Sequence, residues 1–390
     1  MKDFAYLEKN AIYLDSACQS LRPQPVIDAL NDYYTKHNSC GERVKYEWGT
    51  ITDEKVEATR AKVLKYLKKS PRHYFVSFTL NTTYGLNLLL SQINVKAAGI
   101  KTIVTSDIEH NSPFLSTISC AKKNKLKRLV LSRNADGSLP VTEIPDHALV
   151  VVNCASNIDG RLLTNIKDVI KTVHKKHGYI IIDAAQAMAH SKEILYGVEP
   201  DAICFSAHKM YAPSLGGIVI RKDFAKLIDV NFIGGGMVDD VDKETYLLSK
   251  DNKEHNYTQF ESGLQAWGEI IGLGAAIDWL NSLPESAHQE LAENSQKLFD
   301  FLSSHPHIHL INESPATTMS FYVDKKETGF DSHILGAALA DEGIMARTGY
   351  FCVHYYLDHV KHYPPLLRFS LGYHTTAKDI DKVITALKKI

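Results

Sequence analysis

The chain has 390 residues, of which 44% are hydrophobic and 23% are charged, a composition typical of a globular protein large enough for two domains. Its 44 basic and 45 acidic residues leave a formal net charge of -1, which argues against a general nucleic-acid binder or a protein of acidic lipid surfaces. No apolar run reaches the roughly 18 to 20 residues that span a bilayer, and the N-terminal residues lack the apolar segment of a signal peptide. We therefore expect a cytoplasmic protein without membrane contact.

Seven short apolar runs, rich in β-branched residues, predict strands in the first part of the chain. They contain no polar alternation, which indicates strands that are covered on both faces. The runs span residues 74–78, 102–106, 128–132, 148–155, 179–183, 202–206 and 217–221. The last two are joined too closely for a helical crossover, so this pair should be antiparallel.

Helical patterns fill several of the gaps between these strands. Examples are residues 83–93 and 165–178, and Gly178 suits the C-cap of the second helix. Strands that alternate with helices predict an α/β fold with a doubly wound, mostly parallel sheet.

The pattern changes after about residue 225. The polar stretch 237–259 predicts a loop or hairpin, and long helical segments follow at 266–283 and 286–305, before an α+β tail. We expect a large domain formed by residues 16–262 and a smaller domain formed by residues 1–15 and 263–390.

Five of the predicted strands end on polar or reactive side chains. In an open α/β sheet, ligands sit beyond the carboxyl ends of the strands, so these side chains should surround one site. They are Asn81, Thr82 and Thr83; Asp107, Glu109, His110 and Asn111; Ser156 and Asn157; Asp183 and Gln186; and Ser206, His208 and Lys209.

Each of these residues also has a purely structural interpretation. Thr82 and Thr83 could cap the helix that begins there, although a helix N-terminus with hydroxyls also binds phosphate. Asp183 could form a turn, and His110 could be a surface imidazole. Lys209 is harder to explain in this way, because a lysine between two buried runs must reach solvent, pair with an acid or react.

One cofactor, pyridoxal 5'-phosphate, accounts for the whole set. It requires a lysine for covalent attachment, a carboxylate opposite its ring nitrogen, a flat group over the ring and a phosphate site. Asp183 and Lys209 are separated by about one strand-helix-strand crossover, so they can end neighbouring strands. A carboxylate about 4 Å from a pyridinium contributes about 4 kcal/mol at an effective dielectric constant of about 20. That corresponds to roughly three pKa units, enough to keep the ring protonated near neutral pH.

Nine motifs identify a family resemblance that extends from about residue 12 to the C-terminus. They are "YLDSACQSLRPQPVIDAL", "NTTYGLN", "EHNSP", "ASNIDGRL", "DAAQAMAH", "FSAHKMYAP", "FESGLQAWGEIIGLGAAIDWL", "ARTGYFC" and "LRFSLGYHTT". In this order the chain resembles the class V aminotransferase-like, fold-type I pyridoxal-phosphate enzymes, in particular the SUF-type (group II) cysteine desulfurases. The resemblance implies a large domain with a seven-stranded sheet, a smaller α+β domain and a homodimer.

The resemblance also implies roles for individual residues. Lys209 would bind the cofactor covalently and move the α-proton, Asp183 would hold the ring nitrogen, Gln186 the ring oxygen, and His110 would stack on the ring. The positions that match phosphate binding are Thr83, Ser206 and His208, with Thr82 beside them.

Three further residues match positions for the amino-acid substrate and its sulfur. Asn157 and Arg368 match the site of the substrate carboxylate, where the guanidinium can form a bidentate pair. Cys352 matches the cysteine that becomes a persulfide, and since the thiolate is the reactive form, a nearby cation such as Arg347 would assist it.

The function implied by the resemblance is conversion of L-cysteine to L-alanine with transfer of sulfur to Cys352, or the related selenocysteine lyase reaction. An alternative is a class V aminotransferase or another carbon-sulfur lyase in which Cys352 is dispensable, as for a loop thiol. A third is a non-catalytic binding protein. A small sulfur-acceptor protein is a plausible partner.

The sequence departs from the family pattern at a few positions. Leu264 stands where a threonine usually reaches the phosphate of the neighbouring subunit, and Asn111 stands where a second histidine is common. Tyr46 stands where another histidine is common, and Tyr350 and Phe351 occupy the two positions before Cys352 that are often histidines.

The other five cysteines are scattered without a C-x-x-C pair, so we expect no disulfide framework and no metal site. They are Cys18, Cys40, Cys120, Cys154 and Cys204.

Overall fold

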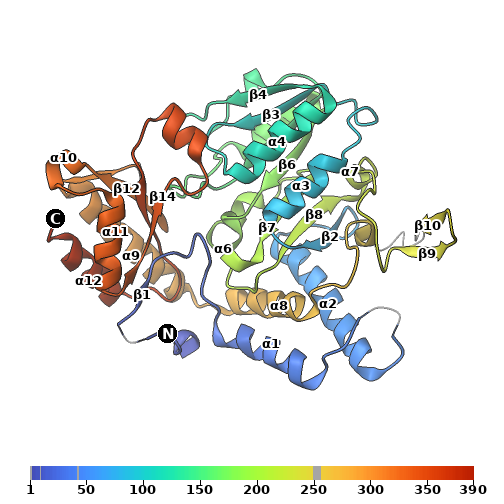
Figure 1. Ribbon diagram of the computed structural model, residues 1–390, viewed down its shortest axis with the longest axis horizontal. Helices are drawn as coiled ribbons and strands as arrows, with labels where there is room; N and C mark the ends of the chain where they lie inside the picture. The colour runs from blue at the N-terminus through green and yellow to red at the C-terminus, as the bar shows by residue number, and fades with distance from the viewer. Residues whose placement is uncertain (1, 9, 42–43, 249–255) are drawn as a thin grey trace.

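The structure is a computed structural model that describes residues 2–8, 10–41, 44–248 and 256–390. Figure 1 shows two lobes: a large central sheet covered by helices, and a smaller lobe built mainly from the C-terminal part of the chain, drawn in orange and red. The N-terminal residues, in blue, cross between the two lobes. The proposed domain boundaries at residues 15 and 262 stay a prediction.

The large sheet has seven strands, as predicted. Their order is β2 (Tyr74–Thr79), β8 (Gly216–Arg221), β7 (Ala202–Ser206), β6 (Tyr179–Asp183), β5 (Ala148–Asn153), β3 (Thr102–Ser106) and β4 (Lys127–Leu131). All neighbouring pairs are parallel except the two that β8 makes with β2 and β7. The predicted antiparallel pair, β7 and β8, is therefore confirmed.

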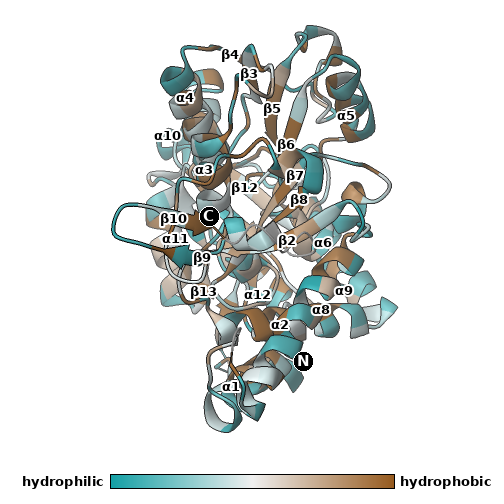
Figure 2. Ribbon diagram, turned by 90° about the vertical axis from the view of Figure 1, so that its right-hand side faces the viewer, coloured by the Kyte–Doolittle hydropathy of each residue, from teal (hydrophilic) through white to brown (hydrophobic). Residues whose placement is uncertain are grey.

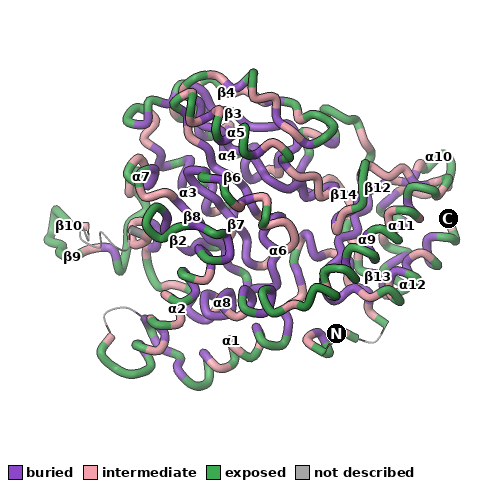
Figure 3. Tube along the Cα trace, turned by 180° about the vertical axis from the view of Figure 1, so that it is seen from behind, coloured by how far each residue is buried: buried purple, intermediate pink, exposed green. Residues whose placement is uncertain are grey.

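Helices on both faces explain why these strands are apolar throughout. Alternate residues of β5 point to opposite faces, so Val150 and Val152 join one buried cluster while Leu149 and Val151 join another. The first cluster includes the apolar face of α5 (Ile166–Lys175), and the second includes residues of α3 (Thr82–Gln92) and α4 (Asn111–Asn124). Figures 2 and 3 show the consequence, since the strands are hydrophobic and buried while the outer helix faces are polar and exposed.

The C-terminal end of α5 differs from the sequence prediction. The helix ends at Lys175, and the residue in the left-handed region is His177, with φ of 55°, rather than Gly178. Glycine is needed at position 178 for another reason, because a Cβ there would lie 2.4 Å from the carbonyl oxygen of Ala148. Gly178 thus lets the chain enter β6 directly beside β5.

Three helices pack together below the sheet in Figure 1: α1 (Gln24–Lys36), α2 (Glu47–Tyr66) and α8 (Trp267–Ser282). The helix α8 is apolar on most of its faces, which is typical of a buried helix. Its glycines permit this close packing, because a Cβ at Gly268 would lie 2.9 Å from Cδ1 of Tyr33 in α1, and a Cβ at Gly274 would lie 2.5 Å from Oγ1 of Thr59 in α2.

The smaller lobe contains an antiparallel sheet in the order β11 (Ile308–Leu310), β12 (Thr318–Val323), β15 (Leu366–Ser370) and β14 (Arg347–Gly349). The helices of this lobe are α9 (Glu285–Ser304), α10 (Lys325–Thr328), α11 (Ser332–Asp341) and α12 (Ala377–Leu387). A π-helical turn covers Tyr355–Val360. The N-terminal strand β1 (Ile12–Tyr13) pairs in parallel with β13 (Ile344–Met345), and this pairing fixes the start of the chain to the lobe formed by its end.

The polar stretch predicted as a loop or hairpin contains the hairpin of β9 (Val238–Val241) and β10 (Tyr246–Leu248), which projects from the molecule in Figure 1. Residues 249–255 of that stretch lie outside the described residues. Two short helices complete the large lobe, α6 (Ala187–His190) and α7 (Lys222–Ala225). Within the described ranges, no helix combines the length and the apolar character needed to cross a membrane.

Candidate active site

A cavity of about 290 Å³ lies at the carboxyl ends of β5, β6 and β7. Its volume is close to the lower limit of about 300 Å³ for small-molecule sites. All eleven residues to which the sequence analysis assigned a role line this cavity: Thr82, Thr83, His110, Asn157, Asp183, Gln186, Ser206, His208, Lys209, Cys352 and Arg368. Of the other polar residues expected around the site, Asn81 lines the cavity, whereas Asp107, Glu109, Asn111 and Ser156 do not. The structure therefore brings together side chains that come from both lobes.

Asp183 and Lys209 face the cavity from neighbouring strands. Asp183 is the last residue of β6, and Lys209 ends the short 3-10 turn after β7. Burial raises the pKa of Asp183, whose Oδ1 accepts a 2.9 Å hydrogen bond from the N-H of Ala185. Burial also lowers the pKa of Lys209, although the charge of Asp183 opposes this shift. The amine is thus shifted toward its neutral, nucleophilic form.

Hydroxyl groups surround the N-terminus of α3. The Thr82 N-H donates to Ser206 Oγ at 3.0 Å, and the two hydroxyls lie 2.7 Å apart. The Thr83 hydroxyl lies 2.6 Å from that of Ser112. Gly216 allows this approach, because a Cβ there would lie 2.4 Å from Cα of Asn81. Free N-H groups and hydroxyls at a helix N-terminus form a site for a phosphate.

His110 presents a neutral imidazole to the cavity. It is the N-cap of α4, and its Nδ1 accepts a hydrogen bond of 3.0 Å from the N-H of Ser112, so the neutral ring carries its proton on Nε2. Burial lowers the pKa of His110 to about 3, with further contributions from the charges of Lys209 and Arg368. Burial likewise lowers the pKa of His208 to about 4, helped by Lys209.

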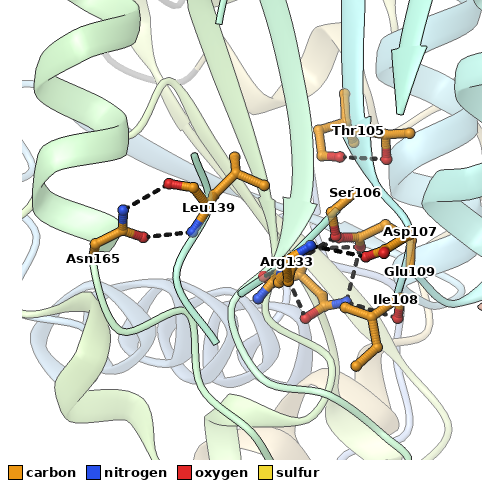
Figure 4. A network of polar contacts seen from close by, with 10 residues as sticks. Thr105, Ser106, Asp107, Ile108, Glu109, Arg133, Leu139 and Asn165 are labelled. Atoms are coloured by element: carbon orange, nitrogen blue, oxygen red, sulfur yellow. Dashed lines mark hydrogen bonds and ion pairs between the residues drawn. The ribbon is translucent and has the colours of Figure 1, made fainter. Parts of the chain in front are cut away.

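A buried ion pair supports the segment that carries His110 (Figure 4). Arg133 Nη2 lies 3.2 Å from Glu109 Oε1, and both side chains are almost completely buried. Ser106 donates its hydroxyl to Glu109, and Asn153 donates its backbone N-H to Glu109 Oε2 at 2.7 Å. The sequence analysis named Glu109 but missed Arg133 and Asn153, although both also occur at the ends of strands.

Arg368 is held by Asn157, which the sequence analysis identified, and by Asp15, which it missed. Its guanidinium donates to the carbonyl of Asn157 at 2.9 Å and to Asp15 Oδ1 at 3.1 Å. Asp15 also accepts from Arg347, at 2.9 Å from Nη2. The Nε of Arg368 is buried and has no hydrogen-bond partner among the described residues. A donor of this kind, at the wall of a cavity, suits an incoming carboxylate.

The loop of Cys352 is held against the cavity by two asparagines. Asn157 Nδ2 donates to the carbonyl of Phe351 at 2.8 Å, and the N-H of Asn111 donates to the carbonyl of Cys352 at 2.6 Å. Phe351 and Cys352 have φ values of 46° and 60°, a left-handed conformation that is uncommon for such residues. Strain of this type persists where surrounding contacts impose it, and it concentrates at functional sites.

The remaining departures from the family pattern have separate surroundings. The Phe351 ring lies 4.7 Å below the guanidinium of Arg368, and Tyr350 packs beside His354. Leu264 is 77% exposed, and Tyr46 is 53% exposed. Gln186, predicted to hold the ring oxygen of the cofactor, donates its Nε2 to the carbonyl of Ala17 at 2.8 Å.

The groups around the cavity fit pyridoxal phosphate. They include a buried carboxylate, a lysine shifted toward its neutral form, a flat neutral imidazole, a helix N-terminus with hydroxyls, and a buried guanidinium N-H without a partner. Within the described residues, no cluster of three or more histidine, cysteine or acidic side chains could hold a metal ion.

Comparisons with known proteins agree with this interpretation. Residues 12–383 match the family "Aminotransferase class-V". A probable cysteine desulfurase of Haemophilus influenzae is 28% identical to this chain, and the alignment covers 99% of this chain and 87% of the relative. A probable cysteine desulfurase of Chlamydia muridarum is 29% identical, and the alignment covers 97% of this chain and 94% of the relative.

The fold has a counterpart among solved structures. The apo structure of a cysteine desulfurase from Thermococcus onnurineus aligns with a TM-score of 0.86 at 24% identity, covering 97% of this chain and 94% of the other. Since the family match extends over nearly the whole chain and includes both lobes, this protein belongs to the class V aminotransferase family.

Proposed function

We propose that this protein is a pyridoxal-phosphate-dependent cysteine desulfurase, which converts L-cysteine to L-alanine and retains the sulfur as a persulfide on Cys352. The observation that carries the proposal is the presence of Cys352 in the same cavity as Lys209 and Asp183. The names of the relatives, given above, support the same activity.

Six residues would hold the cofactor and prepare the reaction. Lys209 would bind its aldehyde carbon, Asp183 would pair with the ring nitrogen, and His110 would cover the ring with its neutral imidazole. The phosphate would occupy the N-terminus of α3, where the hydroxyls of Thr82, Thr83 and Ser206 gather. When bound, the cofactor withdraws electrons from the α-carbon of the amino acid.

The remaining steps use side chains of this chain. Arg368 would bind the substrate carboxylate through its unpaired Nε, and Lys209 Nζ, once free, would accept the α-proton. The Sγ thiolate of Cys352 would attack the substrate sulfur, forming a sulfur-sulfur bond as the carbon-sulfur bond breaks. One cysteine then gives one alanine, and the sulfur remains on the enzyme.

The decisive experiment incubates the purified holoenzyme with L-cysteine and locates added sulfur on peptides by mass spectrometry, while alanine is measured in parallel. We expect one additional sulfur on Cys352, and loss of both persulfide and alanine formation in Cys352→Ser. Cys40→Ser removes another exposed thiol, which does not line the cavity, and provides the matched control. Full activity of Cys352→Ser would favour a lyase in which this thiol is dispensable.

Dimerisation is the second part of the proposal. Four large apolar side chains are strongly exposed on neighbouring segments of the large lobe: Leu80, Phe232, Ile233 and Leu264. These segments touch one another, since Gly263 donates its N-H to Gly235 and the ring of Phe232 lies against Tyr84. Exposed patches of this kind are typical of subunit interfaces. We propose that this patch meets a second copy of the chain beside the N-terminus of α3.

A further inference from the structure

A second cysteine, Cys18, shares the cavity with Cys352. Both side chains line the same space of about 290 Å³, and both thiols are free. Cys18 is partly buried, whereas Cys352 is exposed. The mechanism proposed above uses Cys352 and assigns no role to Cys18.

The segment that carries Cys18 is fixed from both lobes. Its neighbour Ala17 donates its N-H to Ser370 Oγ at 2.8 Å and accepts from Gln186 Nε2 at 2.8 Å. Ser20 donates its N-H to the carbonyl of His208 at 2.9 Å, so the segment is also tied to the turn that presents Lys209. Hydrogen bonds to both lobes hold Cys18 at the cavity wall rather than in a freely moving loop.

Two guanidinium groups lie near Cys18. Arg368 and Arg347 both interact electrostatically with its side chain. Asp15 compensates part of this positive charge, because it pairs with both arginines. Exchange between sulfur atoms proceeds through attack of a thiolate on a neighbouring sulfur, so it requires two sulfur groups within one cavity.

We propose that Cys18 is a second sulfur acceptor, to which the outer sulfur of the Cys352 persulfide moves. The inference rests on the proposed desulfurase function. The Cys18 thiolate attacks the outer sulfur, a bond forms between that sulfur and Cys18 Sγ, and Cys352 leaves as a thiolate. The exchange conserves the oxidation state of the pair and requires no external oxidant. It frees Cys352 for a second substrate while the first sulfur stays within the cavity.

The test follows the position of the sulfur with time. The holoenzyme receives one equivalent of L-cysteine, thiols and persulfides are alkylated at intervals, and the peptides that carry Cys18 and Cys352 are analysed separately by mass spectrometry. We expect the added sulfur first on Cys352 and later on Cys18. In Cys18→Ala the sulfur should remain on Cys352 and persist longer there. Cys40→Ser should behave as the unaltered protein.

Three results would overturn the relay. The first is equal persistence of sulfur on Cys352 in the unaltered protein and in Cys18→Ala. The second is loading of Cys18 in Cys352→Ser, and the third is a Cys18–Cys352 disulfide with release of sulfide.

A separate arm distinguishes failure of the relay from failure of the desulfurase function. If L-cysteine gives no added sulfur on either residue, the proposed function fails. Glutathione persulfide is then used as the donor, and transfer from Cys352 to Cys18 still decides the relay. Retention of the visible absorbance of the cofactor in each variant shows that the site is intact.

Discussion

The buried pair of Glu109 and Arg133 allows a quantitative prediction. In Glu109→Gln the side chain keeps its shape, but it no longer compensates the charge of Arg133. Its single amide oxygen can accept from the Ser106 hydroxyl or from the Asn153 N-H, which donate to different oxygens of Glu109, but not from both. Two opposite charges about 4 Å apart contribute about 4 kcal/mol at an effective dielectric constant of about 20. Loss of one partner of a buried pair typically costs about 3 to 5 kcal/mol, in agreement with that value.

Burial raises the pKa of Glu109 to about 7, so the pair is fully charged only above that pH. The assay is therefore urea unfolding of the holoenzyme at about pH 8.5, followed by the fluorescence of its three tryptophans. We expect Glu109→Gln to lower the free energy of unfolding by about 3 to 5 kcal/mol. The double variant Glu109→Gln with Arg133→Met should recover much of this loss, because it leaves no unpaired charge. A loss below about 1 kcal/mol in the single variant, the size typical of an exposed pair, would refute the reasoning.

Three further predictions concern the site and the interface. Asp183→Asn removes the carboxylate that we propose to lie opposite the ring nitrogen of the cofactor. The lost interaction, about 4 kcal/mol, should lower kcat for alanine formation roughly 10³-fold with the cofactor still bound, and a loss below about tenfold would contradict this role. His110 has a folded-state pKa of about 3, below its usual 6.5, so its neutral form contributes stability that is present above about pH 6.5 and is lost as the pH falls toward 3. His110→Asn, which retains an N-cap acceptor, should therefore reduce the decrease in Tm between neutral and acidic pH, and an unchanged decrease would argue against this assignment. Leu264→Glu places a charge in the proposed interface, where burial of a leucine side chain stabilises the dimer by about 1.5 to 3 kcal/mol. We expect the variant to sediment as a monomer in sedimentation velocity, and a stable dimer would show that the interface lies elsewhere.

Much of the architecture could be predicted from local sequence patterns. Each of the seven strands is a continuous apolar run, because helices cover both faces of the sheet, and the short connection between β7 and β8 leaves no room for a crossover. The predicted site residues at the strand ends follow from the same regularity, since parallel strands end at one edge. Gly178 shows the limit of local patterns. Its position suggested a helix C-cap, but the glycine is required by a close contact with Ala148, which is a tertiary feature.

The polar framework that completes the site could not be read from the sequence alone. Asp15 binds Arg347 and Arg368, and Cys18 lines the same cavity as Cys352, although more than 300 residues separate the members of each pair. Hydrophobic periodicity reports only on neighbours along the chain, so it contains no information about such pairings.

What the sequence by itself determined is the class of fold, the lysine and carboxylate at adjacent strand ends, and the family to which their motifs belong. What only the tertiary structure decided is which distant groups share the cavity. The physical reason is the pairing of β1 with β13, together with the hydrogen bonds of Ala17 to Ser370 and Gln186. These contacts carry the N-terminal segment across both lobes and bring a second thiol, that of Cys18, to the cavity lined by Cys352.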